Sequence, residues 1–436
     1  MTARTALPPI TVSQRSRLGN RMTPVDAMWY WFGTKFPTDQ FLVYAFAGSP
    51  DVDRAVSDVL DRANASPDLK LRIAPRWFDV LFPDWCSADV QPDQVIVHAM
   101  PERTWQALSG ELAGLIDRQL DPRAAAWKLH VYPDLSGVPG TAGTATVVVL
   151  QIAHPLADGL RSSALAGYLF GRDEDVPGAT ARPADGLIMR VVERELQKRR
   201  FADDVEAGTI PPGCSAVPAL STNDVPSGAR TLRTVVVPAS QIAGPTITVG
   251  AMAAIAQALS GYLRARGEDT SQLAAEVLMA KPGVRYAYNH FDAVGVGLHP
   301  DAGSLAERLA LIARDLRTSR IHHEHPAFAA NERVFAAVPA PLRWWGVKRL
   351  NPDARPTMVR GNTAVSSVHR GPADLHFGGC PVTMTCGYPS LSPVMGLTHG
   401  LHGIGDTLAV SVNTTESVIT DLDEYTDRLT AALRPE

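Results

Sequence analysis

The sequence has few cysteines, and its charges of opposite sign nearly balance. Four cysteines occur in 436 residues, and Cys86, Cys214, Cys380 and Cys386 lack the spacings of zinc or redox motifs. We therefore expect no disulfide framework, and a reducing cytoplasm fits the chain. The formal net charge is -4, and no block of five or six like charges is present. This charge distribution argues against a nucleic-acid partner, because such proteins usually carry a basic patch or stripe.

The chain also lacks a long uninterrupted apolar run. The longest apolar stretch, Ile247 to Leu263, contains Gly250, Gln257, Ser260 and Gly261 and falls short of a membrane span. We expect it to form a buried helix. Residues 1–21 carry arginines without an apolar segment, so we expect a flexible arm and no secretory signal there. Any membrane contact is expected to be peripheral, and the location cytoplasmic.

What the sequence does contain is a repeated alternation of helix and strand patterns, in a chain long enough for two or three domains. We predict an α/β (α+β two-layer) fold with mixed sheets. The predicted divisions are a first subdomain over residues 22–175, a crossover helix with a Pro/Gly-rich linker over 176–230, and a second subdomain over 231–436.

Several aromatic residues and histidines invite a functional interpretation, but a packing or loop role is the simpler prediction. The aromatic run from Trp29 to Phe32 is assigned to core packing within a short helix that begins near Pro24. The adjacent histidines of SRIHHEHPAF are assigned to a solvated loop, because zinc ligands usually come from separate elements. THGLHGIGD is predicted to be a turn that leads into a strand. No metal site is predicted. The residues assigned in this way are Trp29, Tyr30, Trp31, Phe32, His322, His323, His325, His399 and His402.

Residues 146–159, TVVVLQIAHPLADG, contain the strongest chemical signal. An apolar strand pattern ends just before His154, and Asp158 and Gly159 follow ahead of a helical stretch. A neutral imidazole within reach of a hydroxyl, with an orienting group behind it, is the arrangement that general-base catalysis needs. From the residues alone, a hydrogen-bonded core histidine remains an equal alternative.

AHPLADG resembles the HHxxxDG motif of the bacterial wax ester synthase/diacylglycerol acyltransferase (WS/DGAT) family, within the CoA-dependent acyltransferase superfamily that includes chloramphenicol acetyltransferase (CAT) and condensation domains. Four further segments are similar to family segments and occur in the same order. They are MTPVDAMWYW (22–31) to SPLDAxF, LDPRAAAWKLHVYPDL (120–135) to LDxxxPLWELHLIxGL, ITVGAMAAIAQALSGYLRARGE (247–268) to the helix after the linker, and VSSVHRGP (365–372) to SNVPGP.

The resemblance implies two CAT-like subdomains with a tunnel at their interface, and His154 as the base that deprotonates an acceptor hydroxyl. Asp158 would be structural, paired with an arginine, and Gly159 would keep the turn close. Ser366 and Ser367 are candidates to bind the oxyanion of the intermediate, with packing or a strand-surface hydroxyl as the alternative role, and Trp127, a candidate for substrate binding, lies in a segment of the family that handles substrate. The resemblance implies no permanently bound cofactor. The acyl donor would be acyl-CoA or a phosphopantetheine thioester on an acyl or peptidyl carrier protein.

The departures from the family pattern bear on the substrate. Ala153 stands where the family has its first histidine, Ala125 and Ala126 replace Pro-Leu, and Ser367 replaces the asparagine of SNVPGP. Lipid or specialised-metabolite acceptors are both expected. Three functions are therefore weighed: an O-acyltransferase that uses acyl-CoA, a condensation-type enzyme that uses a carrier-bound donor, and a non-catalytic lipid-binding homologue.

Overall fold

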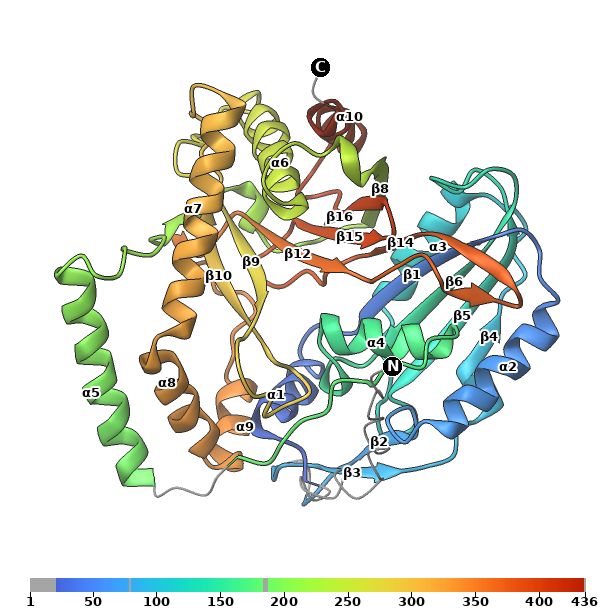
Figure 1. The fold of residues 1–436 in the computed structure, drawn as a ribbon, viewed down its shortest axis with the longest axis horizontal. Helices are drawn as coiled ribbons and strands as arrows, with labels where there is room; N and C mark the ends of the chain where they lie inside the picture. The colour runs from blue at the N-terminus through green and yellow to red at the C-terminus, as the bar shows by residue number, and fades with distance from the viewer. Residues whose placement is uncertain (1–20, 78–79, 183–186, 435–436) are drawn as a thin grey trace, which may run out of the picture.

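The computed structural model describes residues 21–77, 80–182 and 187–434. The predicted flexible arm therefore lies almost wholly outside the described residues. In this part of the chain, two six-stranded mixed sheets form the framework, and helices cover them (Figure 1). The predicted α/β fold with mixed sheets is confirmed.

The first sheet has the strand order β13-β14-β1-β6-β5-β4, in which only β4 and β5 run parallel. Its central strand, β6, is buried along its whole length, as its run of apolar residues predicts. Helices α1, α2 and α4 pack on one face, and α3 packs on the other face together with residues of the second sheet. The strands are β13 (His376–Phe377), β14 (Cys380–Gly387), β1 (Gln40–Ala47), β6 (Ala145–Ile152), β5 (Trp127–Leu135) and β4 (Val95–Val97).

The second sheet has the order β10-β9-β12-β15-β16-β8, with β12 parallel to both of its neighbours. Helices α6 and α10 cover it at the top of Figure 1 and share a core cluster with the sheet. The strands are β10 (Phe291–Gly297), β9 (Ala274–Ala280), β12 (Thr363–His369), β15 (Thr398–Ile404), β16 (Thr407–Thr415) and β8 (Arg230–Pro238).

The ten helices of the described residues are α1 (Pro24–Phe32), α2 (Val52–Ala65), α3 (Trp105–Ile116), α4 (Gly159–Leu169), α5 (Leu187–Glu206), α6 (Ile247–Arg264), α7 (Leu305–Glu324), α8 (Pro326–Ala337), α9 (Ala340–Lys348) and α10 (Leu422–Leu433). Two short sheets pair β2 (Leu71–Ala74) with β3 (Asp84–Ser87), and β7 (Val217–Pro218) with β11 (Met358–Val359). The 3-10 turns are η2 (Pro92–Gln94), η3 (His154–Leu156), η4 (Ser221–Asn223) and η5 (Ala239–Gln241).

Strand β14 connects the two halves of the chain. It lies far along the sequence, after β12, yet it pairs antiparallel with β1 in the first sheet. The first sheet is therefore completed by residues of the second half, and sheet membership does not follow chain order at this point.

The predicted buried helix at Ile247 is confirmed as α6, whose N-terminus is capped by the Thr246 side chain. Gly267 follows it with a positive φ of 83°, a conformation that glycine adopts without strain. Across the described ranges, no helix combines the length and the apolar character needed to cross a bilayer.

Two histidine predictions are wrong. His322 and His323 lie in the last turn of α7, and His325 caps α8 by accepting the N–H of Ala327, so none lies in a solvated loop. The ring of Phe201 on α5 packs edge-on against two of them and explains their burial. His399 and His402 belong to the buried strand β15, where pairing with β12 and β16 overrides the local preference of three glycines for a turn.

Candidate functional site

His154 lies just after the last residue of a central strand of the first sheet, against the first residue of β10 in the second sheet. Strand β6 ends at Ile152, and His154 opens the 3-10 turn η3 before Asp158 caps helix α4. Pro155 is the second residue of this turn, where its missing N–H costs no hydrogen bond. A buried strand, a short turn and a capped helix thus fix the backbone on both sides of the imidazole.

Aromatic rings enclose the imidazole of His154. The ring of Trp29 on α1 stacks parallel to it with 3.7 Å between centroids, and the ring of Phe291 on β10 lies 5.9 Å away. Burial lowers the pKa of His154 to about 4, while its own carbonyl group, the Asn289 side chain and the charge of Asp158 act in the opposite direction. The imidazole is therefore neutral at physiological pH and holds a lone pair that can accept a proton.

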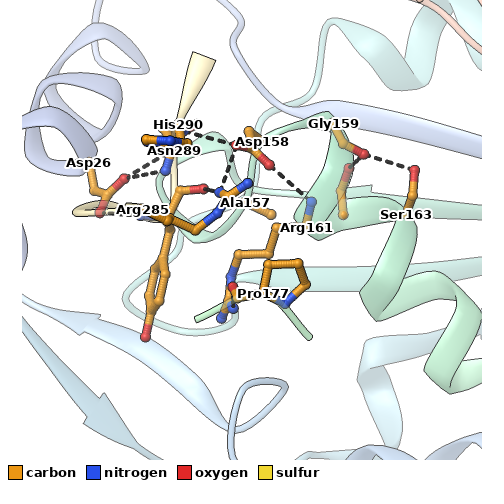
Figure 2. A network of polar contacts seen from close by, with 12 residues as sticks. Asp26, Ala157, Asp158, Gly159, Arg161, Ser163, Pro177, Arg285, Asn289 and His290 are labelled. Carbon is orange, nitrogen blue, oxygen red and sulfur yellow. Dashed lines mark hydrogen bonds and ion pairs between the residues drawn. The ribbon is translucent and has the colours of Figure 1, made fainter. Parts of the chain in front are cut away.

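Asp158 is buried and fully engaged by groups other than His154 (Figure 2). One carboxylate oxygen accepts the backbone N–H of Arg161 at 2.9 Å, which is the N-cap bond of α4. The other accepts Nη1 of Arg285 at 2.7 Å and the backbone N–H of His290 at 2.9 Å. The arginine that the sequence left unidentified is thus Arg285, just before β10. In the described structure, no hydrogen bond joins Asp158 to the imidazole.

Gly159 lies where the two halves approach each other. A Cβ atom added there would stand 3.1 Å from Cγ2 of Val368 on β12, closer than ordinary van der Waals contact. Ser366 lies on the same face of β12 as Val368, since side chains two residues apart point the same way. Ser367 points to the other face, where its hydroxyl lies 2.8 Å from that of Thr248 on α6. Of the two predicted serines, only Ser366 shares the face that meets α4.

The structure contradicts the predictions made for two tryptophans, Trp127 and Trp29. Trp127 was predicted to lie near substrate, but it is fully buried in the core of the first sheet, with its indole N–H donating to the carbonyl of Leu69 at 2.7 Å. The aromatic run that was assigned to the core does supply Trp31, but the prediction is wrong for Trp29, which is half-buried against His154. Trp29 and Trp31 are two residues apart and so lie on opposite sides of α1, and the sequence carries no sign of which ring faces the imidazole.

The residues that approach His154 from the second half were not predicted. Asn289 donates from Nδ2 to the carbonyl oxygen of His154 at 2.9 Å and to Oδ1 of Asp26 at 2.9 Å. Asp26 is fully buried on α1, within the segment that resembles SPLDAxF. That resemblance was the only available signal for Asp26, and nothing in the sequence singled out Asn289, Arg285 or His290.

A pocket of about 460 Å³ lies beside this group, between the β9–β10 connection and helices α5, α7 and α8. Its wall includes His290 and Asp292, while Asn289 and Phe291, the residues that alternate with them, face His154. The pocket is therefore separated from the imidazole by the start of β10. It does not correspond to the predicted tunnel at His154, which stays a prediction.

The fold and the site together describe a protein of two mixed sheets with an HxxxDG segment where its two halves meet. The chain resembles a wax ester synthase/diacylglycerol acyltransferase from Marinobacter aquaeolei VT8, with a TM-score of 0.62 and 18% identity over 95% of this chain and 98% of the other. It also resembles the starter condensation domain of rhizomide synthetase RzmA in complex with C8-CoA and Leu-SNAC, with a TM-score of 0.59 and 11% identity over 95% and 92% of the two chains. These likenesses show the shared fold.

Residues 288–435 match the family model described as the WS/DGAT C-terminal domain. The resemblance drawn from the sequence motifs is thereby confirmed, and this part of the chain is similar to the C-terminal domain of WS/DGAT proteins. Comparison with curated protein sequences gave no match. The matched residues include Asn289 and His290 as well as the strand with Ser366, whereas His154 and Asp158 lie before them.

Proposed function

We propose that the protein is an O-acyltransferase that transfers an acyl group from a thioester to a hydroxyl acceptor, with His154 as general base. The observation that supports this most directly is a neutral imidazole, with its pKa lowered to about 4, held at the junction of β6 and α4. Asp158 is assigned to the turn and to its ion pair with Arg285 instead of to proton transfer.

The proposed reaction balances without a further reactant. Nε2 of His154 accepts the hydroxyl proton as the acceptor oxygen attacks the thioester carbonyl carbon. The tetrahedral oxyanion needs hydrogen-bond donors, and Ser366 is the proposed side-chain donor. The carbon–sulfur bond then breaks, and the proton passes from His154 to the departing thiolate. No permanently bound cofactor is required, since the donor thioester supplies the acyl group.

Acyl-CoA is the first donor to test, because one structural relative was determined with C8-CoA. The second candidate is a condensation-type enzyme with a donor tethered to a carrier protein, since condensation domains share the fold. The third is a non-catalytic lipid-binding homologue. We place the protein in the cytoplasm with at most peripheral membrane contact, and we propose a lipid or specialised metabolite as acceptor.

The test is to incubate the purified protein with acyl-CoAs of several chain lengths and with acyl-carrier proteins, against a panel of alcohols and amines, and to identify products by mass spectrometry. Ester formation from acyl-CoA supports the proposal. Amide products, or activity only with carrier proteins, favour the condensation-type alternative. Tight binding of acyl chains without any product favours the binding homologue.

His154→Ala is expected to lower kcat by about 10³-fold, because a general base contributes about 10² to 10⁴ in rate. His376→Ala is the matched control, since this histidine is exposed on β13 and should change neither turnover nor stability. Circular dichroism and thermal melting establish that both variants fold. A folded His154→Ala variant with undiminished turnover refutes the mechanism.

A further inference from the structure

Two buried polar atoms, one on the proposed base and one beside it, lack a partner in a neighbouring residue. Among the described residues, neither Nδ1 of His154 nor Oδ1 of Asn289 makes a hydrogen bond of ordinary geometry, and the backbone carbonyl of His154 itself acts on the imidazole as an acceptor. The two side chains are neighbours, since Asn289 donates to the backbone carbonyl of His154 and its side chain acts on the pKa of the imidazole. Buried polar atoms are nearly always paired, so this pair of unsatisfied atoms is informative.

The orientation of the Asn289 amide is determined by its other contacts. Both groups that its nitrogen approaches, Oδ1 of Asp26 and the carbonyl oxygen of His154, are acceptors, so Nδ2 must lie there. Turning the amide over would place Oδ1 against two oxygens. Oδ1 is therefore an acceptor on the other side of the amide.

Asp26 in turn is held by donors from two elements. Its Oδ2 accepts the hydroxyl of Thr23 at 2.7 Å and the backbone N–H of Tyr288 at 3.0 Å, and its Oδ1 accepts the backbone N–H of Asn289 at 2.9 Å. Figure 2 shows Asp26 and Asn289 facing each other beside the Asp158 network. Burial raises the pKa of Asp26, and the hydrogen bonds from Asn289, Thr23 and Tyr288 oppose that rise. This carboxylate ties α1 to the segment before β10.

We propose that Asn289 is a positioning residue for the base: its Oδ1 accepts Nδ1–H of His154, which fixes the tautomer that leaves Nε2 free to take the acceptor proton. Asp26 acts through Asn289 by preventing the amide from turning. The hydrogen bond closes when substrate binds, since catalytic hydrogen bonds are often long in unliganded proteins and tighten in the complex. This inference rests on the proposed function, because it names the group that orients its base.

Asp158 does not take this role, because each of its contacts is to another group. Its oxygens accept from the Arg161 and His290 backbone N–H groups and from Arg285. The orientation of the imidazole therefore comes from a residue of the second half of the chain.

The first measurement is the tautomer of His154 in the wild-type protein. Long-range ¹H–¹⁵N spectra of the histidine-labelled protein, with His154→Gln to assign the signal, distinguish Nδ1–H from Nε2–H directly. With a non-reactive thioether analogue of C8-CoA bound, we expect the Nδ1–H form. An Nε2–H form in the complex overturns the proposal whether or not any variant folds.

The second measurement compares variants of Asn289. Asn289→Ala is expected to give a mixture of tautomers and to lower kcat about 10²-fold with KM changed less than about threefold, because only the base is affected. Asn289→Asp keeps an acceptor for Nδ1–H, so it should keep the tautomer, raise the pKa of His154 and move the acid limb of the kcat profile to higher pH. An unchanged tautomer and kcat in Asn289→Ala contradict the role.

Asn223→Ala is the matched control. The Asn223 amide also donates to two backbone carbonyls, of Gly361 and Val394, each at 3.0 Å, in the second half of the molecule. It should lower thermal stability as Asn289→Ala does, without changing the tautomer or kcat. If His154→Ala remains active, the proposed function fails while the tautomer data stand, so the two failures are distinguishable.

Discussion

The two segments that meet at the site, residues 147–163 and residues 285–292, contribute in different ways. The first runs from β6 through η3 into α4 and supplies His154 with a turn whose cap is local in sequence. The second leads into the edge strand β10 of the other sheet and supplies Arg285, Asn289 and the N–H of His290. The proposed base thus comes from a local motif, whereas the partners of its turn come from more than a hundred residues away.

The largest loss of stability is expected when the ion pair between Arg285 and Asp158, which joins the two segments, is removed. Arg285→Ala leaves the carboxylate of Asp158 buried without its cation, which should cost about 3–5 kcal/mol in the free energy of unfolding. Denaturant unfolding measures this loss.

Arg233→Ala is the control for that experiment. The Arg233–Asp423 pair is exposed on both sides, so its removal should cost less than about 1 kcal/mol. If the two arginine variants lose equal stability, the buried pair does not join the two segments energetically.

In contrast to Asp158, the buried carboxyl group of Asp39 in the first half has only neutral partners. Asp39 accepts hydrogen bonds from the N–H of Leu120 and Nε2 of Gln151, both neutral groups, and burial raises its pKa to about 7. Between pH 4 and 7 the folded protein holds this proton and the unfolded chain releases it. Stability therefore falls as pH rises through this window, by about 4 kcal/mol at most, and no further above pH 7.

Asp39→Asn should remove that part of the pH dependence, because the amide keeps one acceptor oxygen and carries no charge. Urea unfolding of both proteins at pH 5, 6, 7 and 8 measures the difference. We expect the free energy of unfolding of the variant to rise relative to that of the wild type as pH rises, and to exceed it at pH 8. Parallel pH profiles would show that Asp39 does not titrate in this range.

The smallest effect is expected at the steric contact between the halves. Gly159→Ala would place a methyl group 3.1 Å from Val368, so we expect a loss of about 1 kcal/mol. Combining it with Val368→Ala, which opens space, should give less destabilisation than the sum of the single variants, measured as a double-mutant cycle. Additive losses would mean that the two residues do not touch.

The fold was predictable because strand and helix patterns repeat along most of the chain. The site was predictable as far as His154, Asp158 and Gly159, because these residues lie within one stretch of six residues. The partners of Asp158 and of the His154 carbonyl were not predictable, because Arg285 and Asn289 carry no periodic or spacing signal. Their position depends on how the segment before β10, a strand of the second sheet, packs against the first half of the chain. The histidines of β15 were mispredicted for a similar reason, since pairing with two strands outweighs the turn preference of their glycines.

The pairing of β14 with β1 in the first sheet also affects how the protein folds during its synthesis. During synthesis the first sheet emerges with β1 as an edge strand, and the strand that covers this edge is completed only at Gly387. An exposed apolar edge invites pairing with other chains until then. A fragment that ends before β14 should therefore aggregate, and supplying residues 376–387 on the same fragment is the minimal repair. We therefore expect the first sheet to be completed only after Gly387 has been synthesised.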